Sequence, residues 1–178
     1  MTISKTNSNV VTFDGKPITL IGWKLKVGDI ARNVRLVDRY LKTVLPIAES
    51  RGKVRLLITV ISVDTEIGSI VTKKFSDAIA QFGQQMAAYI ISADLPFAQT
   101  RWCNLQQVNN MTMLSDYRDM DFARNWGVLI KEFSLLTPAI FVLNSTDKII
   151  YREIISEITE EPNYQAVLAH LKIAIGSD

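Results

Sequence analysis

Side chains that could carry out covalent or acid–base chemistry are scarce in this chain of 178 residues, which has one cysteine and one histidine. The cysteine, Cys103, would react as a thiolate, and a thiol normally titrates at about 8.5. One cysteine forms no internal disulfide, so we expect a free thiol in a reducing compartment. The histidine, His170, precedes Leu171 in a C-terminal segment of helical pattern, and we expect it at a helix surface. A single histidine excludes a multi-histidine metal site.

Cys103 closes a distinctive segment, Ser92-Ala-Asp-Leu-Pro-Phe-Ala-Gln-Thr-Arg-Trp-Cys103. This segment resembles the resolving-cysteine region of the bacterial thiol peroxidases, which are atypical two-cysteine peroxiredoxins. Other segments match the same family in the same order and spacing, namely Lys26-Val-Gly-Asp29, Leu114-Ser-Asp-Tyr-Arg-Asp119, Trp126-Gly-Val128, and Glu157-Ile-Thr-Glu-Glu-Pro162 followed by Tyr164. Together the matches cover residues 9 to about 172.

The resemblance assigns four positions to the peroxide-reducing site and one to the resolving cysteine. Peroxiredoxins stabilise the reactive thiolate with a proline, a threonine and the cysteine on one loop and helix start, and with an arginine from a distant strand. Aligned residue by residue, Thr65 keeps the threonine, whereas Ile61 replaces the proline and Gly68 replaces the cysteine. Pro138 stands where the arginine belongs, and Cys103 stands where the resolving cysteine belongs.

These replacements remove the groups that the family's reaction needs. Gly68 has no nucleophile, and Pro138 has neither a charge nor an N–H group with which to stabilise a thiolate or bind a peroxide oxygen. Ser69 is no substitute, because a serine oxygen cannot be oxidised and reduced again as a sulfur can. We therefore expect that the chain has lost the peroxidatic site by natural divergence and does not reduce peroxides.

Three functions remain open, and no residue is assigned a catalytic role. In the first, the chain keeps the family fold as a binding or regulatory homodimer. In the second, it is a thiol-dependent oxidoreductase that uses Cys103 as its only redox thiol, and only then would thioredoxin be a partner. In the third, it binds a small molecule in the vacated pocket between Thr65, Gly68 and Pro138. For Cys103 itself we favour the role of a small apolar residue beside Trp102.

Composition narrows the cellular context. The chain has 20 basic and 18 acidic residues, interspersed and giving a net charge of +2, which provides no argument for nucleic acid. No apolar run approaches the roughly 20 residues of a membrane span, and residues 1–8 lack the apolar core of a signal peptide. We expect a cytoplasmic protein without a membrane partner. The spacing of Asp116, Asp119, Asp121 and Glu132 fits no metal loop, so we predict neither a metal nor a cofactor.

The elements that must position these residues alternate between strands and helices. Two alternating segments, 10–13 and 18–21, flank Asp14-Gly15 and predict a hairpin with a two-residue turn. Apolar, β-branched segments predict buried strands, and three-and-four spacing predicts amphipathic helices. The strands are expected at 54–61, 87–92, 139–143 and 149–154, and the helices at 67–82, from about 95 through Cys103 with Asp94 as its cap, and at 162–175.

This pattern predicts an α/β protein of three layers with a single domain over residues 1–178, of which 1–8 are expected to be flexible. The resemblance implies a thioredoxin-like fold with a central mixed sheet flanked by helices, an N-terminal hairpin, and a homodimer formed through the face that carries the active site. Gly68 costs about 1 kcal/mol relative to alanine inside a helix, and three β-branched residues follow it at 70–72. We therefore expect the helix to start late or to fray around Gly68.

Overall fold

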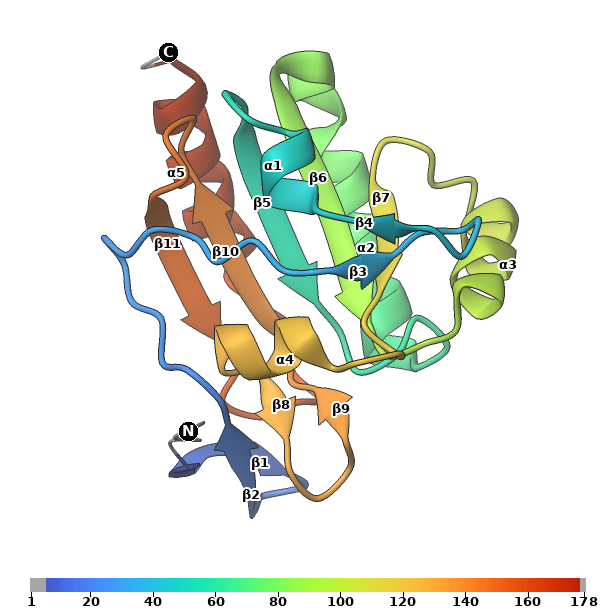
Figure 1. Cartoon of the computed structure of the whole chain (residues 1–178), viewed down its shortest axis with the longest axis vertical. Helices are drawn as coiled ribbons and strands as arrows, with labels where there is room; N and C mark the ends of the chain where they lie inside the picture. Colours follow the sequence, from blue (N-terminus) through green and yellow to red (C-terminus); the bar gives the residue numbers. More distant parts are fainter. Residues whose placement is uncertain (1–5, 177–178) are drawn as a thin grey trace.

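The structure is a computed structural model that describes residues 6–176. Within that range the chain alternates strands with helices (Figure 1). The elements in chain order are β1 (Thr6–Phe13), β2 (Lys16–Ile21), β3 (Leu36–Val37), β4 (Thr43–Val44), α1 (Pro46–Glu49), β5 (Val54–Thr59), α2 (Glu66–Ile79), the 3₁₀ segment η1 (Ala80–Gln85), β6 (Met86–Ser92), α3 (Pro96–Gln106), β7 (Thr112–Ser115), α4 (Asp121–Trp126), β8 (Leu129–Ile130), β9 (Leu135–Leu136), β10 (Ala139–Leu143), β11 (Ile149–Ile154) and α5 (Tyr164–Gly176).

The central sheet is mixed, as expected, and has the strand order β11-β10-β5-β6-β7-β3-β4. Strands β5, β6 and β7 are parallel, whereas β10 runs antiparallel to both β5 and β11. Every residue of β5 and β10 is buried, which explains why their sequences are mostly apolar without alternation. The polar exceptions are Arg55 and Thr59 of β5, whose side chains donate hydrogen bonds to Ser50, Ile47 and Thr137. A smaller sheet of order β1-β2-β8-β9 lies at the lower end of the molecule in Figure 1.

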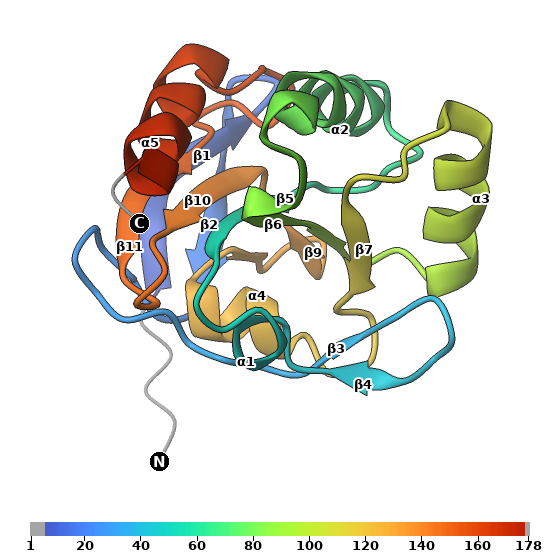
Figure 2. The same cartoon turned by 90° about the horizontal axis from the view of Figure 1, so that it is seen from above.

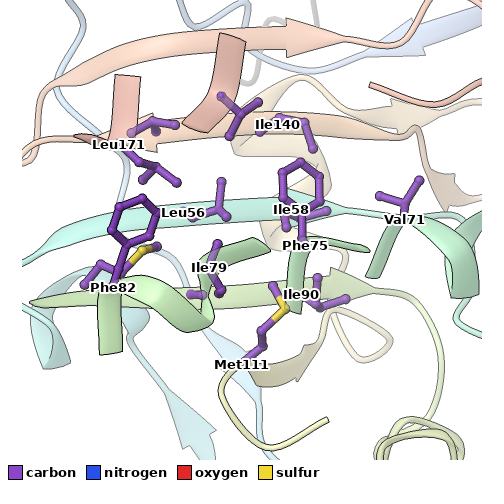
Figure 3. Packing of buried hydrophobic residues seen from close by; sticks show 14 of the residues in the cluster. Leu56, Ile58, Val71, Phe75, Ile79, Phe82, Ile90, Met111, Ile140 and Leu171 are labelled. Atoms are coloured by element: carbon purple, nitrogen blue, oxygen red, sulfur yellow. The ribbon is translucent and has the colours of Figure 1, made fainter. Parts of the chain in front are cut away.

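Helices cover both faces of the central sheet, so the three layers predicted from the alternating pattern are present. Figure 2 shows α2 and α5 on one face and α1 and α4 on the other. On the α2 side, Phe75 and Ile79 from α2 pack with Ile58 from β5, Ile140 from β10 and Leu171 from α5 (Figure 3). Because these residues come from four elements, the core fixes the end of α2 relative to the sheet.

The N-terminal hairpin is confirmed. Asp14 and Gly15 have φ values of 49° and 73°, the positive values that a tight two-residue hairpin turn requires. The hairpin is longer than expected, because residues 6–8, which were expected to be flexible, form the start of β1, where Thr6 and Asn7 pair with β2. Residues 1–5, also expected to be flexible, lie outside the described residues.

The start of helix α3 differs from expectation. Helix α3 carries Cys103 as predicted, but its N-cap is Leu95, which makes no side-chain capping bond. The carboxylate of Asp94 instead accepts hydrogen bonds from the Val63 N–H (2.9 Å) and the Ser92 hydroxyl (2.7 Å). Asp94 therefore joins the loop before α2 to the end of β6, and the helix start depends on Pro96 at its first positions.

Candidate functional site

Thr65 fixes the start of α2. It is the N-cap residue, with the extended backbone (φ −79°, ψ 149°) that capping requires. Its Oγ1 accepts a hydrogen bond from the Gly68 N–H (3.1 Å) and donates one to the Ser62 carbonyl (2.7 Å). A threonine cap contributes about 0.5 to 2 kcal/mol, which offsets the cost of about 1 kcal/mol for a helical glycine. The expectation that the helix starts late is therefore wrong, because α2 begins at Glu66 and contains Gly68 in its first turn.

Gly68 is packed against the loop that precedes the helix. An ideal Cβ built on Gly68 overlaps the Ser62 carbonyl oxygen and lies 2.7 Å from Thr65 Oγ1. Both of these contacts are closer than any ordinary contact of a Cβ atom. The backbone has thus closed over the place where the family resemblance puts a reactive side chain. Residue 68 now has no room for one unless the 62–65 loop moves.

Pro138 faces the same closed region. It lies between β9 and β10, and its carbonyl accepts a hydrogen bond from the Ile155 N–H (3.1 Å). Ile61, Gly68 and Pro138 line one cavity of about 10 Å³, which is at the lower limit for a single water. The structure therefore brings these three positions together, as the resemblance implied. This cavity is too small for a ligand, and Thr65, the other residue of the expected pocket, lines a larger cavity instead.

Cys103 lies elsewhere. It is half-buried on α3 and lines a separate cavity of about 420 Å³, together with Arg39 and Met111. Burial raises the pKa of the Cys103 thiol, and the charge of Arg39 lowers it by a smaller amount. Because only the thiolate is a good nucleophile, this environment makes Cys103 less reactive than an exposed cysteine.

Two contacts join α3 to the start of α2. The Arg101 guanidinium pairs with both carboxylate oxygens of Asp64 (2.7 and 2.8 Å), and the Trp102 indole N–H donates to the Ser69 hydroxyl (3.0 Å). The ion pair is more than half exposed on both sides, so it contributes at most about 1 kcal/mol. These residues act between elements as packing and surface contacts.

A large apolar depression lies beside the closed site. We call it the hairpin groove, and its volume is about 760 Å³. Sequence reasoning missed it because its walls come from distant segments, as shown by the edge-to-face contact of Phe13 and Phe133 with ring centroids 5.9 Å apart. The alternating pattern of the hairpin was the only available signal. The groove is lined by Phe13, Ile61, Thr65, Glu66, Ile67, Ile70, Phe133, Leu135, Ile158, Thr159 and Glu161.

Glu157 attaches the hairpin to the wall of this groove. Its carboxylate accepts hydrogen bonds from the Thr12 hydroxyl (2.8 Å), the Gly15 N–H (3.0 Å) and the Thr159 hydroxyl (3.1 Å). The bond from the Gly15 N–H is the largest of the causes that lower the pKa of Glu157 to about 2. The carboxylate is therefore charged at any ordinary pH and holds the turn that follows Phe13.

Three of the other polar residues considered from the sequence have structural partners. Asp116 accepts hydrogen bonds from the Phe122 and Ala123 N–H groups, and Glu132 accepts from the Thr19 N–H. His170 is bonded to the Ala166 carbonyl (2.8 Å) and packs against the Tyr151 ring. Among residues 6–176 no three ligating side chains form a group able to hold a metal ion. No helix in the same range is long and apolar enough to cross a membrane.

Comparison with known proteins gives a consistent result over most of the chain. The family model described as Redoxin matches residues 26–168. The thiol peroxidase of Bacillus subtilis is 39% identical over 165 residues, covering 93% of this chain and 98% of that protein. The thiol peroxidase of Staphylococcus aureus is 42% identical over 163 residues, covering 91% and 97% respectively.

Solved structures agree with these relatives. A peroxiredoxin-like protein from Aquifex aeolicus has a TM-score of 0.86 and 36% identity, covering 93% of this chain and 97% of that one. The thioredoxin-like fold implied by the sequence motifs is therefore confirmed, with its mixed sheet, flanking helices and N-terminal hairpin. The chain belongs to the Redoxin family and, within it, to the bacterial thiol peroxidases.

Proposed function

We propose that this chain is a thiol peroxidase-like protein whose peroxide-reducing site is degenerate and that it serves as a binding or regulatory homodimer in the cytoplasm. The observation that carries the proposal is the closure of the site around residue 68. The Ser62 carbonyl fills the space that a side chain at Gly68 would need, and Pro138 supplies no charge beside it. Family membership alone would suggest a peroxidase, but the reaction requires atoms that these positions lack.

Peroxide reduction begins when a thiolate sulfur attacks one peroxide oxygen, so the enzyme must hold the thiol deprotonated and donate hydrogen bonds to the peroxide. Cys103 is the one cysteine of the sequence, and burial raises the pKa of its thiol. Cys103 also lines a different cavity from Gly68 and Pro138. These features favour a structural role for the thiol.

A peroxide-consumption assay with a thioredoxin system tests the proposal. We expect the wild-type protein and Cys103→Ser to consume hydrogen peroxide and an alkyl hydroperoxide equally slowly, no faster than free cysteine does. Turnover near that of ordinary peroxiredoxins that disappears in Cys103→Ser would establish the alternative function, a thiol-dependent oxidoreductase that uses Cys103 and has thioredoxin as a partner.

The proposed homodimer places a second copy on the exposed start of α3. Leu95 and Phe97 are 51% and 64% exposed there, and the Asp64–Arg101 ion pair flanks them. Exposed aromatic and aliphatic groups beside paired charges of both signs suit a self-complementary contact, in which each acidic group can meet a basic group of the partner. This surface adjoins the α2 start through the same ion pair, so it belongs to the face that carries the degenerate site.

A further inference from the structure

The hairpin groove has the size and character of a ligand site. Its volume of about 760 Å³ lies within the range of known small-molecule pockets, which are mostly apolar with a few polar groups. Phe13, Ile70 and Phe133 expose between 37% and 41% of their surface at this groove. Covering these side chains with an aliphatic chain would remove apolar surface from water, which is favourable.

Most polar groups in the groove are already engaged. Thr65 Oγ1 is bonded to Ser62 and Gly68, and the Thr159 hydroxyl donates to Glu157. The Glu161 carboxylate accepts from the Lys74 ammonium group (2.7 and 2.9 Å). A ligand can therefore bind these groups only by displacing an existing partner.

Glu66 differs from these residues. It is exposed, and among residues 6–176 it takes part in no ion pair. Within the described range 6–176, no lysine or arginine lines the groove. The N-terminus of α2 contributes roughly +0.5 charge near Glu66, which only partly offsets the carboxylate. Because Lys74 neutralises Glu161, the groove keeps a net negative charge at Glu66.

We propose that the hairpin groove binds an aliphatic chain that ends in a cationic group, such as a long-chain amine. The chain would lie against Phe13, Ile70 and Phe133, and the cation would pair with the Glu66 carboxylate. This inference rests on the proposed function, because it gives the binding protein a ligand. Carboxylate amphiphiles are disfavoured because they would place a second negative charge beside Glu66.

Calorimetric titration of the purified full-length chain with decylammonium, decanol and decanoate, each below its aggregation concentration, tests the proposal. The three probes share one chain length and differ in the charge of the head group. We expect decylammonium to bind roughly 2- to 5-fold more tightly than decanol, the effect of one exposed ion pair, and decanoate to bind most weakly.

Three variants separate charge from apolar contact. Glu66→Gln should abolish the preference for decylammonium over decanol without preventing decanol binding. Ile70→Asn should weaken both probes several-fold, because Ile70 is an exposed part of the apolar wall. Asp119→Asn is the matched control, since it removes an exposed carboxylate outside the groove and should change neither affinity. Urea unfolding of each variant checks that the fold is intact.

The proposal is overturned if decanoate binds as tightly as decylammonium, if Glu66→Gln leaves the preference unchanged, or if no probe binds the wild-type protein. These outcomes are independent of the peroxide assay. A protein that binds none of the probes and reduces no peroxide would contradict the ligand but not the degenerate site, whereas a protein that reduces peroxide would contradict the proposed function.

Discussion

At Gly68 the missing Cβ allows the Ser62 carbonyl to approach the backbone of α2, and the Thr65 hydroxyl closes the remaining space. Two effects therefore oppose each other when a methyl group is added at this position. Helix propensity alone would make alanine more stable than glycine by about 1 kcal/mol. The overlap with a backbone carbonyl acts in the other direction, and it cannot be relieved by rotating a side chain.

We expect the overlap to dominate, so that Gly68→Ala lowers the free energy of unfolding by about 1 to 3 kcal/mol, the usual cost of overpacking. Urea unfolding followed by circular dichroism measures the effect. The matched control is Gly176→Ala, because an added Cβ at Gly176 meets no atom within 4 Å. If Gly68→Ala proved more stable than the wild type, the closure of the loop over residue 68 would be disproved.

At this scale the sequence predicted which residues meet but not how tightly. The resemblance placed Ile61, Gly68 and Pro138 in one site, and the structure places them around one cavity. The approach of the Ser62 carbonyl could not be predicted, because it depends on the backbone path of the loop and not on the type of residue 62.

At the scale of elements, short-range capping decides where the helices begin. The Thr65 cap places the start of α2 at Glu66 despite Gly68. Helix α4 uses a more distant group. Its N-cap, Met120, has a left-handed backbone (φ 51°) and no side-chain capping bond, and Asp116 supplies the acceptors for the first turn. Such a cap is separated in sequence from the helix it stabilises, so a local motif does not reveal it.

Asp116 gives α4 a pH dependence of unusual sign for an aspartate. Burial raises the pKa of Asp116 to about 6, and the backbone N–H groups of Ala123 and Phe122 reduce that increase. Because the folded-state pKa exceeds the unfolded value of about 3.9, the folded protein holds this proton more tightly. The contribution to stability is therefore complete below about pH 4 and is lost as the pH rises through about 6.

We expect this group to lower the free energy of unfolding by about 2 kcal/mol between pH 4 and pH 7, slightly less than the full equivalent of a shift of about two pKa units, because pH 4 already lies at the unfolded-state pKa. Urea unfolding at both values measures it as the difference between the wild type and Asp116→Asn, in which residue 116 no longer titrates. Asp116→Asn also loses one capping acceptor, and this loss is the same at pH 4 and at pH 7. Only the change with pH in the stability difference between the two proteins therefore reports the titration of Asp116. Asp119→Asn is the control for an exposed neighbour, and a pH-independent difference for Asp116→Asn would contradict the prediction.

At the scale of the whole molecule, periodicity and the resemblance together predicted most of the architecture. Buried strands were expected at 54–61, 87–92 and 139–143 and lie at 54–59, 86–92 and 139–143, because both faces of each are covered and most of their residues are apolar. The two-residue strands β3, β4, β8 and β9 were not predicted, since such short pairs have no periodic signal. The hairpin groove depends on β8 and β9 to carry Phe133 and was missed for the same reason.

The proposed dimer is the property of the whole molecule that can be tested most simply. If a second copy covers the start of α3, Phe97→Asp should shift the protein from dimer to monomer, because it places a charge in an apolar contact. Analytical ultracentrifugation at several concentrations measures the change. Leu105→Asp, on the same helix and 73% exposed in the monomer, is the control and should remain dimeric. A wild-type protein that is monomeric at all concentrations would contradict the proposal.

The central claim, that this chain lacks both the groups and the space for peroxide chemistry, is tested most directly by the rate constant for reaction with hydrogen peroxide. Stopped-flow mixing would compare wild type, Gly68→Cys and the double variant Gly68→Cys with Pro138→Arg. Wild type should react no faster than free cysteine, and Gly68→Cys should gain little, because its new side chain overlaps Ser62 and lacks a cation. A charge-assisted hydrogen bond contributes about 1.5 to 3 kcal/mol, so adding the arginine should raise the rate by roughly one to two decades. A wild-type protein or a Gly68→Cys variant that reacted as fast as ordinary peroxiredoxins would contradict the claim.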